Sequence, residues 1–156
     1  MSKSTGPSTP EIRNKKATFR FELLEKFECG LVLHGTEVKS LRAGQASLEE
    51  AYARITGDEV WLHNFHIGPY EHGHTTFHEP MRPRKLLLHR REIHKLTPKV
   101  VQRGFTLVPL AVYFNERGLA KVRLALARGK TFADKREDLR KKDHEREMQR
   151  AARRRR

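Results

Sequence analysis

The chain has 156 residues and a formal net charge of +14, and 33% of its residues are charged. This length predicts one domain with a modest core, and a field this positive favours nucleic acid, an anionic membrane or an acidic protein as partner. The single cysteine, Cys29, excludes an intrachain disulfide and a cysteine-based zinc site, while the lack of a long apolar run predicts a cytoplasmic protein with no membrane partner.

The first part of the chain predicts a leader followed by short strands. Residues 1–13 begin with a run rich in Ser, Thr and Pro and are expected to form a flexible leader, because they bury too little surface to order themselves. Apolar and polar residues alternate over 18–23, which is the period of a half-buried strand. Gly30 indicates a turn or bulge, and residues 31–33 predict another short strand.

A short helix is expected after Gly35. Thr36 is a suitable N-cap for this helix, and Gly44 is placed to end it. Lys39 and Arg42 are three residues apart, so they lie together on one side of the helix. This edge is either a phosphate contact or an ordinary solvated face, and the helix taken alone favours the solvated face.

Two hairpins are predicted, because each turn sequence joins two apolar segments. The paired segments are 51–55 with 59–65, and 105–114 with 119–127. Gly57-Asp58 forms the first turn, and Trp61 in that hairpin is expected in the core.

The region between the hairpins predicts a loop, a buried segment and a helix. The loop over 69–83 is long for a compact domain, which indicates function or mobility. Residues 86–88 form a short apolar run that is expected to be buried. A helix is expected to begin at His89, to restart at Pro98 and to stop at Gly104.

The segment 131–156 is a charged arm. It has almost no large apolar residue after Phe132, so a helix here has no face to bury. We expect this arm to be disordered when free and to gain helix on a negative surface. The chain as a whole predicts a mainly β fold. Residues 14–130 are expected to form a small OB-like antiparallel β-barrel with two or three short flanking helices, and the arm is the basic C-terminal tail that follows it.

Metal and nucleotide sites are not predicted. Five histidines fall close together, but no cysteine and few acids lie near them. They are His63, His66, His72, His74 and His78. Gly129-Lys130-Thr131 resembles the end of a phosphate-binding loop, but Leu124 stands where that loop needs a glycine, which excludes it. We predict no cofactor and no catalytic constellation.

The charged residues favour folded RNA as the partner. Two basic clusters stand out: Arg82, Arg84, Lys85, Arg90 and Arg91; and Lys121, Arg123, Arg128 and Lys130. Aromatic residues are few, which disfavours a stacking platform for single strands and favours shape and phosphate recognition. Glu28 is either an ordinary ion-pair partner or an acceptor for the amino and imino groups of a nucleobase.

Four segments follow one another between about Asn14 and Asp138: NKKATFRFELLEKFECGLVLHGTEVKSLRAG, EVWLHNFHIGPY, RPRKLLLHRREIHKL and KVRLALARGKTFADKRED. In order and spacing they resemble the SsrA-binding protein (small protein B) family, the bacterial partner of transfer-messenger RNA. The resemblance implies an OB-like barrel that binds the transfer-RNA-like part of that RNA and rescues stalled ribosomes in trans-translation. It also implies a protein without catalytic activity that is a monomer when bound.

The resemblance, together with the basic clusters, marks the candidate site residues. The RNA-binding candidates are Asn14, Lys15, Lys16, Glu28, Lys39, Arg42, Arg84, Lys85, Leu87 and Lys130. The candidates for the decoding centre and message channel of the ribosome are Asp134, Lys135, Arg136, Arg140, Lys141 and Lys142.

Two positions depart from the family pattern. Cys29 stands where the family usually has a small, alanine-like residue. Ala133 stands where many relatives carry an aromatic or histidine, and Phe132 is the candidate substitute for a stacking contact. Two other classes stay open: a generic basic protein that binds ribosomes or structured RNA with a steep salt dependence, and a histidine-dependent metal hydrolase.

Overall fold

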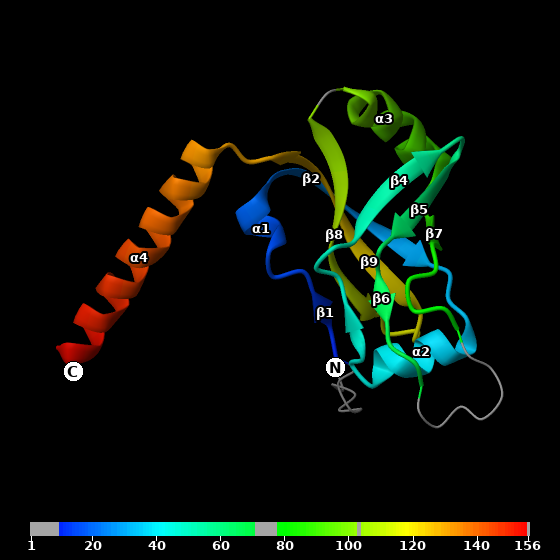
Figure 1. Ribbon diagram of the computed structural model, residues 1–156, viewed down its shortest axis with the longest axis horizontal. Coiled ribbons are helices and arrows are strands. Elements are labelled where there is room, and N and C mark those ends of the chain that lie inside the picture. The colour runs from blue at the N-terminus through cyan, green and yellow to red at the C-terminus, as the bar shows by residue number, and fades with distance from the viewer. Residues whose placement is uncertain (1–9, 71–77, 103, 156) are drawn as a thin grey trace.

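The computed structural model describes residues 10–70, 78–102 and 104–155. Figure 1 shows a curved sheet with short helices around it and a long helix, α4, that extends away from it. The strands are β1 (Ile12–Arg13), β2 (Phe21–Leu31), β3 (Ala46–Ser47), β4 (Tyr52–Thr56), β5 (Glu59–His63), β6 (His66–Ile67), β7 (Arg84–Leu87), β8 (Phe105–Phe114) and β9 (Ala120–Gly129). The helices are α1 (Ala17–Arg20), α2 (Gly35–Arg42), α3 (Arg90–Val101) and α4 (Phe132–Arg154). We call residues 10–130 the body and residues 131–155 the arm.

The main sheet has seven antiparallel strands in the order β1-β8-β4-β5-β7-β2-β9, and β9 also pairs with β8. The sheet thus curls almost fully round. The seam between β4 and β8 is held by a single registered pair, Ala53 with Leu107, so the barrel is not closed. The mainly β, OB-like antiparallel fold predicted from the sequence is confirmed, with this open seam as its departure from a complete barrel.

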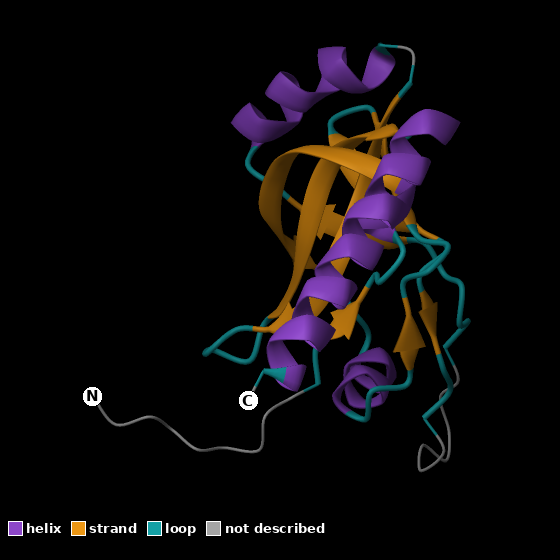
Figure 2. Cartoon of the chain, turned by 90° about the vertical axis from the view of Figure 1, so that its left-hand side faces the viewer, coloured by secondary structure: helices purple, strands orange, loops and turns teal. Residues whose placement is uncertain are grey.

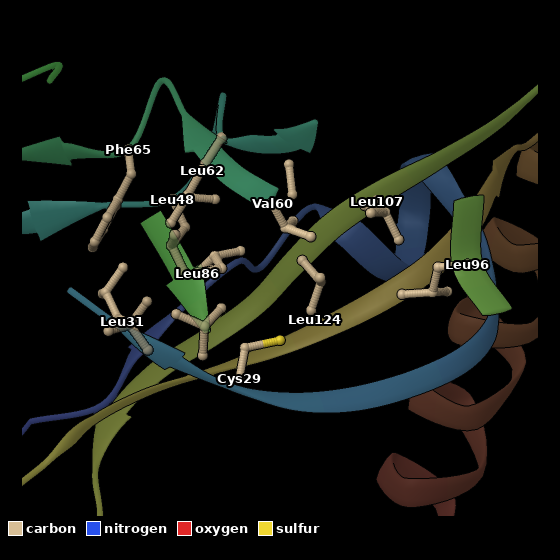
Figure 3. Packing of buried hydrophobic residues seen from close by; sticks show 14 of the residues in the cluster. Cys29, Leu31, Leu48, Val60, Leu62, Phe65, Leu86, Leu96, Leu107 and Leu124 are labelled. Atoms are coloured by element: carbon tan, nitrogen blue, oxygen red, sulfur yellow. The ribbon is translucent and has the colours of Figure 1, made fainter. Parts of the chain in front are cut away.

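The core lies inside the curved sheet, as Figure 3 shows. Leucines from β5, β7, β8 and β9 meet there, and each one fully buried contributes about 1.5–3 kcal/mol. Cys29 is completely buried among them, so its small side chain serves packing. Burial also raises the pKa of this thiol to about 12, which keeps it protonated. Helix α3 contributes Ile93 and Leu96 to the same core.

The N-terminal region differs from the sequence prediction. Residues 18–20, expected in a strand, belong to helix α1, and Ala17 of this helix is buried against β8 and β9. Ile12 and Arg13, expected in the flexible leader, pair with β8, and residues 1–9 of that leader lie outside the described residues. Gly30 is not a turn, because β2 runs through it without a break. A Cβ at Gly30 would come within 3.1 Å of the Cβ of Leu87, so the glycine allows β7 to approach closely.

The other local predictions were mostly right. Both hairpins form as predicted, and their turns use positive φ at Gly57 and Gly118. Helix α2 ends before Gly44 as expected, but its N-cap is His34, not Thr36. Three details are corrected: Trp61 is half-buried with its indole N–H donated to Glu59, α3 continues through Pro98 without restarting, and Leu87 in the expected buried run is 52% exposed.

The arm forms one continuous helix, α4, from Phe132 to Arg154. Figure 2 looks at the side of the molecule from which this helix extends. Thr131 caps it, and its two large apolar residues with described side chains, Leu139 and Met148, are exposed. No helix among the described residues is both long and apolar enough to cross a membrane. That the arm is disordered in the free protein stays a prediction.

Candidate nucleic-acid interface

Helix α2 is fixed to the body by a buried carboxylate, Glu37. One of its oxygens accepts a hydrogen bond from Arg82 at 2.6 Å and another from the backbone N–H of His34 at 2.8 Å, and the other oxygen pairs with Arg84. Burial alone would raise the pKa of Glu37, but these hydrogen bonds and the Arg84 charge outweigh it and hold the pKa below its usual value. Glu37 is therefore ionised, and it ties α2 to β7.

Arg84 is part of this internal support. Its side chain is 0% exposed, and besides Glu37 it donates to the carbonyls of Phe65 at 2.5 Å and Pro80 at 3.2 Å. The prediction that Arg84 contacts RNA is incompatible with this burial. In the sequence, Arg84 is a basic residue just before an apolar run, and no sequence signal places Glu37 against it.

The outer side of α2 carries the basic edge predicted from the sequence. The Lys39 ammonium lies 5.4 Å from the centre of the Tyr70 ring, and the Arg42 guanidinium lies 5.0 Å from that of Phe114. Both cations rest on aromatic faces, which limits their conformations while leaving their charge available. Lys39 also lines a hollow of about 610 Å³ with Arg82 at the start of α2. This edge is suited to the phosphates of a nucleic-acid backbone.

The outer face of the sheet brings together a second set of residues, which we call the Glu28 face: Glu28, Lys85, Leu87, Tyr113 and Arg123. Glu28 pairs in register with Arg123 of β9, and Gly30, two residues further along β2, pairs with Leu87. Lys85 is two residues before Leu87 on β7, so it lies on the same side of the sheet, and it pairs with Glu59 at 3.1 Å. The structure thus places three predicted RNA-binding residues on one surface.

Tyr113 was missed in the sequence because β8 is an apolar strand with only a weak alternation. Its hydroxyl donates to Glu28 at 2.5 Å, and the Arg123 guanidinium lies 5.2 Å from its ring centre. The alternation of Val122 and Leu124 with Arg123 already indicated that Arg123 points outward from β9.

The three N-terminal candidates lie elsewhere. Asn14 donates to the carbonyl of Pro109 at 3.1 Å, while its buried side-chain oxygen has no hydrogen-bond partner among the described residues. Lys15 is exposed, and Lys16 pairs loosely with Glu49 at 3.6 Å. These residues precede α1, which Figure 1 shows on a different side of the body from α2. The predicted RNA-binding residues described so far therefore form three groups: the edge of α2, the Glu28 face and this N-terminal set.

Lys130 joins the arm to the body. Its ammonium donates to the carbonyl of Thr18 at 2.6 Å and pairs with Asp138, and its backbone N–H donates to the carbonyl of Arg20 at 3.0 Å. Its side chain is 14% exposed. In this arrangement the Lys130 charge is engaged within the protein, so the predicted RNA contact at Lys130 requires the arm to move.

The predicted ribosome-binding residues lie along the first turns of α4. Asp134 completes the capping box with Thr131, whose hydrogen bonds lower the pKa of Asp134. Lys135 and Lys142 each lie 5.9 Å from the ring centre of Phe19 in α1, so they contact the body. The side chains of Arg136, Arg140 and Lys141 are exposed. Nothing is described of the Phe132 side chain, so the proposed stacking substitute lies outside the described residues.

The described histidines do not converge on a metal site. His63 stacks on Tyr52, and His78 is buried between the hydroxyl of Thr36 and the carbonyl of Ile67, 3.0 Å from each. The described part of the chain holds no group of three or more histidine, cysteine or acidic residues placed to bind a metal ion. His72 and His74 lie outside the described residues.

Comparisons with known proteins place this geometry in context. Residues 11–154 match the family described as SmpB protein. The SsrA-binding protein of Desulforudis audaxviator is 53% identical over 94% of this chain and 95% of its own length, and that of Thermobifida fusca is 54% identical over 99% and 95%. A solved structure described as "tmRNA-SmpB: a journey to the center of the bacterial ribosome" contains a chain that is 49% identical, with a TM-score of 0.68, covering 84% of this chain and 95% of that one.

Proposed function

This chain belongs to the SmpB protein family, and from that premise we propose that it binds transfer-messenger RNA and delivers it to stalled ribosomes for trans-translation. The observation that carries the proposal is that about half of the aligned residues are identical to SsrA-binding proteins, in alignments that span 94% and 99% of this chain. The net charge of +14 supports a polyanionic partner. We propose an RNA-binding role for the protein and assign it no catalytic step.

The body would select the RNA. The Glu28 face offers a carboxylate and the exposed Leu87 side by side, while the edge of α2 offers Lys39 and Arg42. Base edges are read by groups such as a carboxylate, and phosphates are held by the cations. Asn14, Lys15 and Lys16 would extend the contact toward α1, and Arg84 would act indirectly by holding α2 in place.

The arm would act on the ribosome. Its first turns carry Asp134, Lys135, Arg136, Arg140, Lys141 and Lys142, which we assign to the decoding centre and message channel. A helix that is polar all round gains little from packing on its own body and much from a negative surface. In the described part of the chain it meets the body through the polar contacts of Lys130 and through lysines that lie over the Phe19 ring, and ribosomal RNA would compete with these contacts.

The test is competition binding with the full chain. Labelled transfer-messenger RNA should be displaced by unlabelled transfer-messenger RNA and poorly by an unrelated structured RNA of equal length. Equal displacement by both would favour the alternative, a generic basic protein that binds ribosomes or structured RNA.

A pair of substitutions refines this test. Lys39→Ala and Arg42→Ala should each weaken binding to both RNAs alike and reduce the magnitude of the salt-dependence slope by about 1, as expected for a phosphate contact. Lys26→Ala, on β2 outside the proposed contacts, is the matched control and should change the slope less.

A further inference from the structure

The carboxylate of Glu28 is held by a neighbouring side chain that does not itself carry charge. The Tyr113 hydroxyl donates to one oxygen of Glu28 at 2.5 Å. This contact joins β8 to β2 across the width of β9, because β9 is the strand between them. A short hydrogen bond to a charged acceptor is among the stronger polar contacts, so it fixes where the carboxylate points.

Arg123 stands in the position from which it would neutralise Glu28. The two residues are directly opposite in the β2–β9 register, where opposite charges attract. Instead, the guanidinium of Arg123 lies 5.2 Å from the ring centre of Tyr113 and pairs with Glu11 at 3.6 Å. The Tyr113 ring therefore offers the Arg123 guanidinium a cation–π contact in place of an ion pair with Glu28.

The phenol is suited to act only as a donor. Partial burial raises the pKa of Tyr113 to about 12, and the hydrogen bond to Glu28 acts in the same direction. At neutral pH the hydroxyl is fully protonated, and one lone pair of Glu28 is occupied. The other Glu28 oxygen stays available as an acceptor, since a carboxylate has about four acceptor positions.

We propose that Tyr113 is a positioning residue that holds Glu28 as an oriented acceptor for the N–H groups of an unpaired nucleobase, with Arg123 stacked on its ring so that the carboxylate is not neutralised. A carboxylate reads donor groups such as the amino group of cytosine, and specific RNA recognition takes place mostly at unpaired bases. The inference rests on the proposed function and names the contact through which the body distinguishes its RNA.

The experiment measures the affinity of full-length variants for transfer-messenger RNA and for an unrelated structured RNA of equal length. Tyr113→Phe removes only the hydroxyl, so it should weaken binding to the specific RNA about tenfold and leave binding to the unrelated RNA unchanged. Tyr52→Phe is the matched control, because this tyrosine stacks on His63 in β5 and makes no contact with Glu28. It should change neither affinity.

A double substitution separates positioning from a direct contact. If Tyr113 acts through Glu28, Tyr113→Phe should add no further loss in a Glu28→Ala background, where the Tyr113 hydroxyl has lost its acceptor. Additive losses, equal losses for both RNAs, or no loss would overturn the inference. If the unaltered protein does not distinguish the two RNAs, the proposed function itself fails, and that outcome is separate from the behaviour of Tyr113.

Discussion

The body and the arm are held in place by different kinds of contact. The body encloses a continuous apolar core and a buried ion pair between Glu37 and Arg84. The arm has no apolar face, and it meets the body through Lys130 and through two lysines lying over Phe19. The body is thus held in one arrangement before any partner binds, whereas the arm can exchange its weak contacts with the body for contacts with a partner.

This difference suits a division of labour. A surface that reads a folded RNA benefits from side chains held in advance, because ordering them on binding costs affinity. An arm that enters a channel benefits from being held weakly. The two regions should therefore respond differently to substitution. Changes at buried positions of the body should lower the free energy of unfolding of the whole domain, and changes in the arm should leave it unaltered.

The largest effect is expected at the buried pair. Glu37→Ala leaves the guanidinium of Arg84 buried without its counter-charge, so the free energy of unfolding should fall by about 3–5 kcal/mol. Denaturant unfolding followed by circular dichroism measures this loss. Glu59→Ala is the control: its pair with Lys85 is exposed, and the expected loss is about 0–1 kcal/mol. Similar losses for both variants would mean that Glu37 does not anchor the body.

A smaller effect is expected at the start of the arm. Thr131→Ala removes the side chain that accepts from the backbone N–H of Asp134, so the first turn of α4 should lose about 1 kcal/mol of helix stability. Hydrogen exchange of amides 132–138 should accelerate while the global unfolding of the body stays the same. Gln149→Ala, in the C-terminal part of α4, should leave those amides unchanged. A drop in body stability on losing Thr131 would contradict the separation of the two regions.

The smallest effect is a pH dependence confined to the arm. Hydrogen bonds from the side chain and backbone of Thr131 hold the pKa of Asp134 below its ordinary value of 3.8. A lowered folded pKa stabilises the helix above pH 3.8, and this contribution is lost as the pH falls through the folded pKa. The protection of amides at the start of α4, measured relative to their intrinsic exchange rate at each pH, should therefore fall on acidification below that value. In Asp134→Asn this fall should be weaker, and an unchanged acid response would show that another group is responsible.

The parts of the fold that the sequence could predict are those fixed by local chemistry. The two hairpins and the end of α2 follow from glycines at positive φ, at Gly57, Gly118 and Gly44. In contrast, the sequence pattern predicts a strand where α1 forms, because four residues are too few to show a helical period. The alternation over 18–23 belongs only partly to β2.

The parts that could not be predicted depend on distant partners. Gly30 signals a turn in sequence, but in the structure it makes room for Leu87 on another strand. Arg84 looks like a surface cation until Glu37 is placed against it. The proposed role of Tyr113 depends on its hydrogen bond to Glu28, which is two strands away in the sheet. The candidate site was therefore predicted residue by residue, while the contacts that orient it had to come from the structure.

The central claim is that the body selects the RNA and the arm acts on the ribosome. It is tested most directly by truncating the chain after Lys130, which removes α4 but keeps the backbone contact of Lys130 with Arg20. The truncated protein should retain most of its affinity for transfer-messenger RNA and lose the tagging of peptides on stalled ribosomes. Normal tagging without the arm, or loss of RNA binding together with it, would contradict the account.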